Sequence, residues 1–266
     1  MIKPSLLNKT LIRFNLWEKV RAWRVGIPIM LFMGLPCYMM LISVIDSTEP
    51  EAAAKNVWNI FNNSSIYFLL AYLFISDGLL SGRPTGEPET LNLLFTRPIT
   101  RTCYVLSKFF CGFLGSTVVL FISVALTLGV ATSLGIVENP IDTHFVFSVV
   151  FNCLIFSAFY VFLHAMPSLL GLVSYLFFSG CQTVGEIMSI GYSSSAPTFF
   201  KYVKDAILFF NYWFGDVFPS CVDFSLIASS YYACTELIVV YLSNLSLFLF
   251  LAILILSLRE FSYGSD

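Results

Sequence analysis

The sequence predicts an all-helical protein embedded in a membrane, and three observations support that fold class. Hydrophobic residues make up 58% of the 266-residue chain and charged residues only 11%, whereas a soluble domain carries about a quarter charged residues. The mean hydropathy is +0.83. Apolar residues also gather into runs of about twenty, the length that a helix needs to cross a hydrocarbon core of about 30 Å. We expect one membrane domain over residues 1–266, without tandem repeats.

Six apolar runs are long enough to span a bilayer. They comprise residues 25–45, 57–75, 104–128, 145–166, 168–190 and 236–258. The fourth and fifth runs are separated only by a short corner, where Pro167 favours a helix boundary. Joining these two runs would require one helix much longer than a bilayer is thick, so we expect six transmembrane helices.

The distribution of basic residues predicts the orientation of the spans. Most Lys and Arg residues lie in residues 1–24, in the connection between the second and third spans at residues 76–103, and in the C-terminal tail. The opposite side holds Lys55, Lys201 and Lys204. Since cytoplasmic loops carry the excess of positive charge, we expect a cell inner or cytoplasmic membrane, with both termini and residues 76–103 in the cytoplasm.

Two segments outside the spans have the pattern of helices that lie at a membrane surface. In residues 1–24, apolar side chains recur at helical spacing beside basic ones, which predicts an amphipathic helix in the headgroup layer. This helix either anchors the first span only or also contacts a cytoplasmic partner. We expect residues 191–235 to lie outside the cell, where their pattern predicts short interfacial or re-entrant helices. The two stripes are Ile12, Leu16, Val20 and Trp23, and Phe200, Val203, Ile207 and Phe210.

The polar stretch at residues 87–101, which reads EPETLNLLFTRPITR, lies between the second and third spans. Pro88 suits the first turn of a short helix, where Glu87 and Glu89 would meet the positive end of the helix dipole. Thr100 is placed to cap the helix of the third span, and Arg101 follows at its start. We expect a cytoplasmic elbow whose charges suit docking to another protein.

The elbow resembles the cytoplasmic elbow of type-2 ATP-binding cassette (ABC) exporter permeases. That family has acidic residues, a leucine-rich turn, a Ser/Thr-x-Pro-Ile/Val-Ser/Thr-Arg run and a later Gly-Lys pair. This sequence departs at Glu89, where the family usually has glycine, and at Ser107, which precedes Lys108. The matching residues are Glu87, Glu89, Thr90, Leu91, Leu93, Leu94, Thr96, Pro98, Ile99, Thr100, Arg101 and Lys108.

The resemblance implies a transport subunit rather than an enzyme. Two six-span permeases would pair as a homodimer or a heterodimer, and separate ATPase subunits would bind ATP and Mg²⁺. This chain has no G-x-x-x-x-G-K-[S/T] loop, in keeping with that division of labour. We expect no cofactor, catalytic residue, metal site or nucleic-acid partner on this chain. The residues expected at the ATPase contact are Glu87, Glu89, Arg97, Pro98, Thr100 and Arg101.

Polar residues inside the apolar runs are candidates for the translocation path, because such groups are costly at membrane depth. For the asparagines, hydrogen bonds between helices are the favoured role. The candidates are Asn62, Asn63, Asn152, Glu186 and Asn244.

Two other functions compete with the ABC permease. A secondary transporter would normally have inverted repeats and broken helices, neither of which the sequence clearly shows. An intramembrane enzyme is disfavoured because H-E-x-x-H and G-x-S-x-G motifs are absent. The identity of the substrate and a disulfide between Cys221 and Cys234 stay open.

Overall fold

A computed structural model describes residues 12–13, 16–17, 19, 23–45, 50–76, 100–136, 141–166, 170–171, 173–175, 202, 205–206, 208–209 and 231–258. Within these residues all regular structure is helical, which confirms the all-helical part of the predicted fold class. Residues 77–99, which contain the elbow as far as Ile99, most of the predicted fifth span and most of residues 191–235 lie outside the described residues. The total of six spans therefore stays a prediction.

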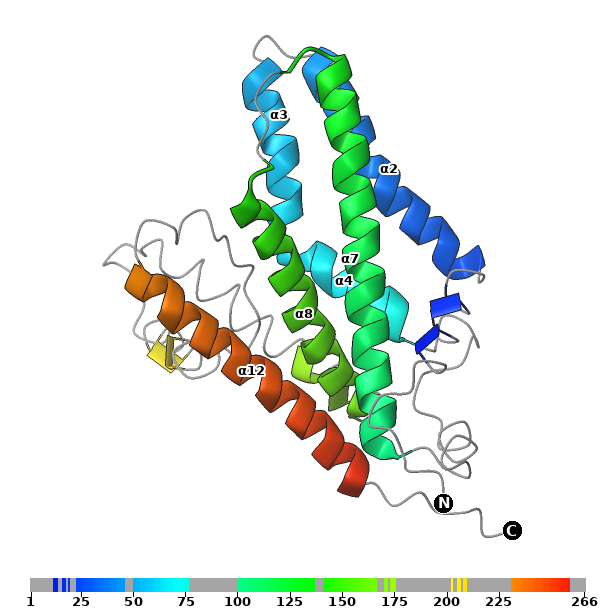
Figure 1. The fold of residues 1–266 in the computed structure, drawn as a ribbon. Helices are drawn as coiled ribbons and strands as arrows, with labels where there is room; N and C mark the ends of the chain where they lie inside the picture. The colour runs from blue at the N-terminus through cyan, green and yellow to red at the C-terminus, as the bar shows by residue number, and fades with distance from the viewer. Residues whose placement is uncertain are drawn as a thin grey trace.

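Four long helices correspond to the first, third, fourth and sixth predicted spans. The third is the longest, and its 33 residues correspond to a length of about 50 Å, so it extends beyond the hydrocarbon core at one or both ends. In Figure 1 it runs the length of the bundle, between the first helix on one side and the other two on the other side. These helices are α2 (Trp23–Ile45), α7 (Arg101–Ser133), α8 (Thr143–Ala165) and α12 (Tyr231–Leu258).

The second predicted span is not one continuous helix. The structure has α3 (Pro50–Trp58), a 3₁₀ turn η1 (Asn59–Asn62) and α4 (Ser64–Ile75) in its place. Asn63 is extended, with ψ of 121°, and its Oδ1 accepts a hydrogen bond from the Ser65 N–H at 2.9 Å. Because asparagine side chains compete with the helix for backbone partners, the prediction of a single helix over residues 57–75 is wrong.

The helix that follows this break, α4, is too short to cross a bilayer. Its 12 residues correspond to about 18 Å, and it runs across the bundle behind α7 (Figure 1). Non-helical backbone at membrane depth is tolerated only where protein or water satisfies it. At this break the Tyr67 hydroxyl, which is 1% exposed, donates to the Phe61 carbonyl at 2.7 Å.

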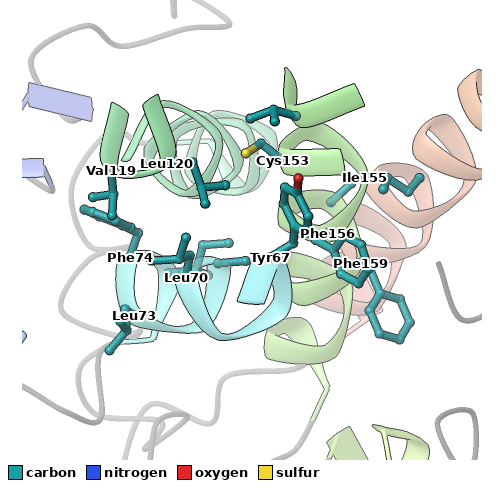
Figure 2. Packing of buried hydrophobic residues seen from close by; sticks show 14 of the residues in the cluster. Tyr67, Leu70, Leu73, Phe74, Val119, Leu120, Cys153, Ile155, Phe156 and Phe159 are labelled. Carbon is teal, nitrogen blue, oxygen red and sulfur yellow. The ribbon is translucent and has the colours of Figure 1, made fainter. Parts of the chain in front are cut away.

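The core forms where α4 packs against α7 and α8. Figure 2 shows Leu70 and Phe74 of α4 facing Val119 and Leu120 of α7. On the other side the Tyr67 ring of α4 stacks on Phe156 of α8, with ring centroids 5.7 Å apart. The crossing helix therefore fills the space between two long helices and contacts both.

Two glycines of α7 make this close packing of α4 possible. A Cβ on Gly115 would lie 2.4 Å from the Phe74 ring, and one on Gly112 would lie 2.5 Å from Ile75 Cδ1. Small residues at such contacts allow helices to approach closely in a bilayer. A further contact joins the same helices, since the Cys111 thiol donates to the Phe74 carbonyl at 3.6 Å.

A proline in α2 explains a polar contact between α2 and α7. Pro36 lies inside α2 and has no N–H, so it leaves the Phe32 carbonyl without its helical donor. The Ser123 hydroxyl of α7 donates to this carbonyl at 3.2 Å. Neighbouring serines are a usual means of satisfying such carbonyls in membrane helices, so this bond links the two helices.

The outer faces of α2 and α12 are covered with large apolar side chains. Met30 of α2 is 74% exposed, and Phe250 of α12 is 60% exposed. These faces suit contact with lipid or with another apolar helix rather than with water. Together with the three described helices that are long and apolar enough to cross a membrane, they support an integral membrane protein.

Replacing Gly115 by alanine should weaken the packing of α4 on α7. The added methyl group would overlap the Phe74 ring, so we expect the free energy of unfolding to fall by about 1–3 kcal/mol. Gly129→Ala is the matched control, because nothing lies within 4 Å of a Cβ at that position. The stability of both variants is measured by thermal unfolding in detergent, monitored by the reaction of a thiol-specific dye with buried cysteines as they become exposed. Equal stability of the two would contradict the packing described here.

Removing the Ser123 hydroxyl should lower the stability of the protein only while Pro36 is present. Ser123→Ala leaves the Phe32 carbonyl without a donor, and we expect a loss of about 1 kcal/mol of stability. In the background Pro36→Ala, a backbone N–H at position 36 can bond that carbonyl, so Ser123→Ala should have little effect. A double-mutant cycle in unfolding free energy measures the difference, and additive effects would argue against the link.

Candidate coupling site at the elbow end of the bundle

The helices that flank the elbow come together at one end of the bundle. The elbow begins after the end of α4 and finishes where α7 starts, and α12 also ends here, because Arg101 of α7 contacts Ser257 of α12. We call this region the elbow end. The charged residues Glu87, Glu89 and Arg97, together with Pro98, lie outside the described residues, so the structure describes the two anchor points of the elbow.

Thr100 caps the helix that follows the elbow. Its backbone is extended, with φ of −72° and ψ of 147°, and its Oγ1 accepts a hydrogen bond from the Cys103 N–H at 3.2 Å. A threonine in this position satisfies one of the first helical N–H groups, which have no partner within the helix. The predicted cap is confirmed, and it fixes where the elbow ends and α7 begins.

Arg101, the next residue, joins the start of α7 to the end of α12. Its guanidinium Nη1 donates to the Ser257 carbonyl at 2.5 Å, in the last turn of α12. Carbonyls at a helix C-terminus lack helical donors and carry partial negative charge, so a cation is favoured there. The sequence suggested an ATPase contact for Arg101, and the structure adds this partner within the chain. Its role in docking stays a prediction.

Two lysines hold the end of α4, where the elbow begins. The Lys108 ammonium of α7 donates to the Ile75 carbonyl at 3.5 Å, and the Lys19 ammonium donates to the Ser76 carbonyl. Lys19 is 1% exposed and Lys108 is 4% exposed. Burying an ammonium group is costly unless it is well partnered, and the terminal carbonyls of α4 provide such partners.

Lys19 brings the N-terminal segment to the same place. Ile12 is buried and Leu16 packs on the core. Leu16 follows Ile12 by four residues and Lys19 follows Leu16 by three, so all three lie on one helix face. Arg13 and Trp17 point away and are exposed. Ile12 and Leu16 of the apolar stripe thus face the bundle, and Lys19 lies on the same face. Placement of this segment in the headgroup layer stays a prediction.

Lys19 belongs to this site although the sequence analysis did not single it out, and a signal for it was present. Ile12, Leu16 and Lys19 have the i, i+4, i+7 spacing of one helix face. A lysine on an apolar face indicates a buried partner, and only the fold shows that this partner is the carbonyl of Ser76, 57 residues away.

Comparison with known families supports the resemblance of the elbow. The sequence model described as "ABC-2 family transporter protein" matches residues 17–185, which is more than half of the chain. The chain belongs to the ABC-2 transporter family. The match includes Lys19, the elbow, α7 and α8. Searches among curated proteins and among solved structures found no match.

Within this ABC-2 chain, the candidates for a translocation path lie on separate elements. Asn62 and Asn63 are exposed beside the break before α4, and Asn63 caps that helix. Asn244 is half-buried on α12. Glu186 lies outside the described residues. The structure gives no single polar cluster for these described asparagines, and their role in transport stays a prediction.

Asn152 has the helix-to-helix role that the sequence favoured. It is fully buried in α8, and its Oδ1 accepts a hydrogen bond from the Tyr241 hydroxyl of α12 at 2.9 Å. Further along, Phe159 of α8 contacts Phe248 of α12, so the two helices run in the same direction. Because the two helices are parallel, the chain leaves α8 on one side of the bundle and must return to the other side before α12 begins. A further crossing between them agrees with the predicted fifth span.

Among the described residues, no group of three or more histidine, cysteine, aspartate or glutamate side chains is close enough to hold a metal ion. Among the described cysteines with placed side chains, none forms a disulfide; these are Cys37, Cys103, Cys111 and Cys153. The polar chemistry of the described site therefore consists of cations on backbone carbonyls. Such an arrangement can hold helix ends in position and transmit movement between them.

Removal of the cap on α7 should loosen the end of the elbow. Thr100→Ala removes the acceptor for the Cys103 N–H, and caps of this kind contribute about 0.5–2 kcal/mol. Thr100→Ser keeps a hydroxyl and should retain most of that stability. Hydrogen exchange of the first turn of α7, measured by mass spectrometry, should rise in the alanine variant only. Equal exchange in the two variants would count against the cap.

Proposed function

We propose that this chain is the permease subunit of an ATP-driven exporter whose ATPase is a separate chain. The ATPase docks from the cytoplasm on the elbow at residues 87–101 and moves it during the ATP cycle. The observation that carries the proposal is that both ends of the connection containing the elbow, residues 76–101, are anchored. Lys19 and Lys108 hold the end of α4, and Arg101 holds the end of α12.

These anchors give movement of the elbow a path into the bundle. Displacement at the beginning of the elbow acts on α4, which packs against both α7 and α8. Displacement at its end acts through Arg101 on α12, which lies along α8. Hydrogen bonds from charged donors are stronger than those between neutral groups, so the anchors favour joint movement of the groups that they connect. The arrangement of helices would then change when ATP binds.

The assignment of ATP binding to a separate subunit follows from the sequence of this chain. ATP and Mg²⁺ bind to the partner subunit, since this sequence has no Gly-rich phosphate-binding loop. Two permease copies, identical or homologous, pair through apolar outer faces such as those of α2 and α12, and cargo passes between them. Asn62, Asn63, Asn152, Glu186 and Asn244 remain our candidates for lining that path.

One observation favours a second candidate function. The interruption at residues 59–63 is a broken helix of the kind found in secondary transporters, where it holds coupling ions. A secondary transporter would move cargo in vesicles that contain this chain alone, driven by an ion gradient. The ABC exporter requires the ATPase subunit and ATP, so reconstitution with and without the partner separates the two functions.

Reversing the elbow's negative charges should prevent ATPase docking. In the double variant Glu87→Lys/Glu89→Lys, we expect recovery of the ATPase with the tagged permease to fall about tenfold, equivalent to about 1.4 kcal/mol. Permease-stimulated ATP hydrolysis should fall with it. Glu51→Lys is the matched control, because Glu51 is an exposed acid in the first turn of α3, on the side predicted to lie outside the cell.

Both variants should insert into the membrane and elute as the wild type does, since the substitutions lie outside the apolar runs. Normal recovery and stimulation of the ATPase by the Glu87→Lys/Glu89→Lys variant would exclude the elbow as the docking site. Equal losses in Glu51→Lys would show that the effect comes from net charge rather than from position.

A further inference from the structure

The end of α4 receives cations from two different parts of the chain. Lys108 reaches it from α7, and Lys19 reaches it from the segment before α2. We call these two lysines and the carbonyls of Ile75 and Ser76 the lysine junction. Several carbonyls at a helix end lack helical donors, and each lysine bonds a different one. Lys108 belongs to a helix that already packs on α4, whereas Lys19 belongs to a separate segment that this bond attaches to α4.

Lys19 differs from its neighbours in a way that a surface anchor does not require. It is 1% exposed, whereas Trp17, two residues earlier, is 65% exposed. A membrane-surface helix normally keeps its lysines in water or among headgroups. Here the ammonium group is directed inward, onto the last residue before the elbow. The segment is therefore attached to the elbow's starting point by a buried charge.

We infer that Lys19 is a positioning residue of the coupling cycle, which makes the N-terminal helix move together with the beginning of the elbow. This inference rests on the proposed function. When the ATPase displaces the elbow, Ser76 moves, and the N-terminal segment follows because separating a buried ammonium group from the carbonyl that it bonds is costly. Ile12 and Leu16 keep the same helix face on the bundle during that movement.

The consequence is a second route from the elbow to the spans. The N-terminal segment is followed directly in sequence by α2, which packs against α7 through the Ser123–Phe32 hydrogen bond. Movement of Ser76 thus reaches α2 through Lys19, whereas movement of the elbow's other end reaches α12 through Arg101. The two ends of the elbow act on different helices.

The first experiment tests the junction in the permease alone, without an ATPase. Lys19→Met keeps the length of the side chain and removes the charge, and amide exchange in residues 12–19 should rise about tenfold, as local opening becomes easier. Arg13→Met is the matched control on the same segment, because Arg13 is an exposed cation and its loss should leave exchange unchanged. Unchanged exchange in Lys19→Met would overturn the junction.

The second experiment tests coupling in the complex of permease and ATPase in lipid nanodiscs. In the wild type, a non-hydrolysable ATP analogue should alter exchange both in residues 77–99 and in residues 12–19. In Lys19→Met, the change in residues 77–99 should persist and that in residues 12–19 should be lost. Lys19→Arg, which keeps a cationic donor, should restore it. A merely structural role would not separate the two nucleotide-dependent changes.

The outcomes distinguish this inference from the proposed function. If the change in residues 12–19 persists in Lys19→Met, Lys19 is not the link. If the wild-type complex shows no nucleotide-dependent change in residues 77–99, the proposed function fails and the coupling role fails with it, whatever the permease alone shows. Should Lys19→Met not fold, Lys19→Ala, which has no side-chain donor, takes its place with the same expected separation.

Discussion

Backbone carbonyls that lack a helical N–H donor have no water to bond inside a bilayer, and the contacts between helices in this protein follow from that constraint. Pro36 frees the Phe32 carbonyl, and Ser123 of a neighbouring helix donates to it. The break before α4 leaves the Phe61 carbonyl, and Tyr67 donates to it. In each case, the bond also joins two segments that pack together.

The type of donor changes with position along the bundle. Within the bundle the donors are the hydroxyls of Ser123 and Tyr67 and the Cys111 thiol, whereas at the elbow end the cations Lys19, Lys108 and Arg101 also donate. This difference has a physical reason, because a buried cation is costly in hydrocarbon and is favoured beside the negative end of a helix dipole. Charged contacts are therefore concentrated at the elbow end, and neutral ones hold the spans.

The crossing helix α4 connects these two regions. One end follows the break at Asn63, and the other end is held by the lysines. Between them, Gly112 and Gly115 of α7 bring α4 close enough for its side chains to fill the core. A rigid element held in this way can transmit displacement at the elbow to α7 and α8, which a mobile loop between independent spans cannot do.

The sequence by itself determined the features that depend on local chemistry. Apolar runs and the scarcity of charge predicted membrane helices, and the Thr100 cap followed from residue type and position, because each depends on neighbours in the chain. The break at Asn59–Asn62 was missed, since the run at residues 57–75 is apolar enough on average to span. Only the tertiary structure decided the partners of Lys19, Arg101 and Asn152, because these contacts join residues 57, 156 and 89 positions apart, and no local pattern specifies which carbonyl or hydroxyl will lie opposite a side chain after packing.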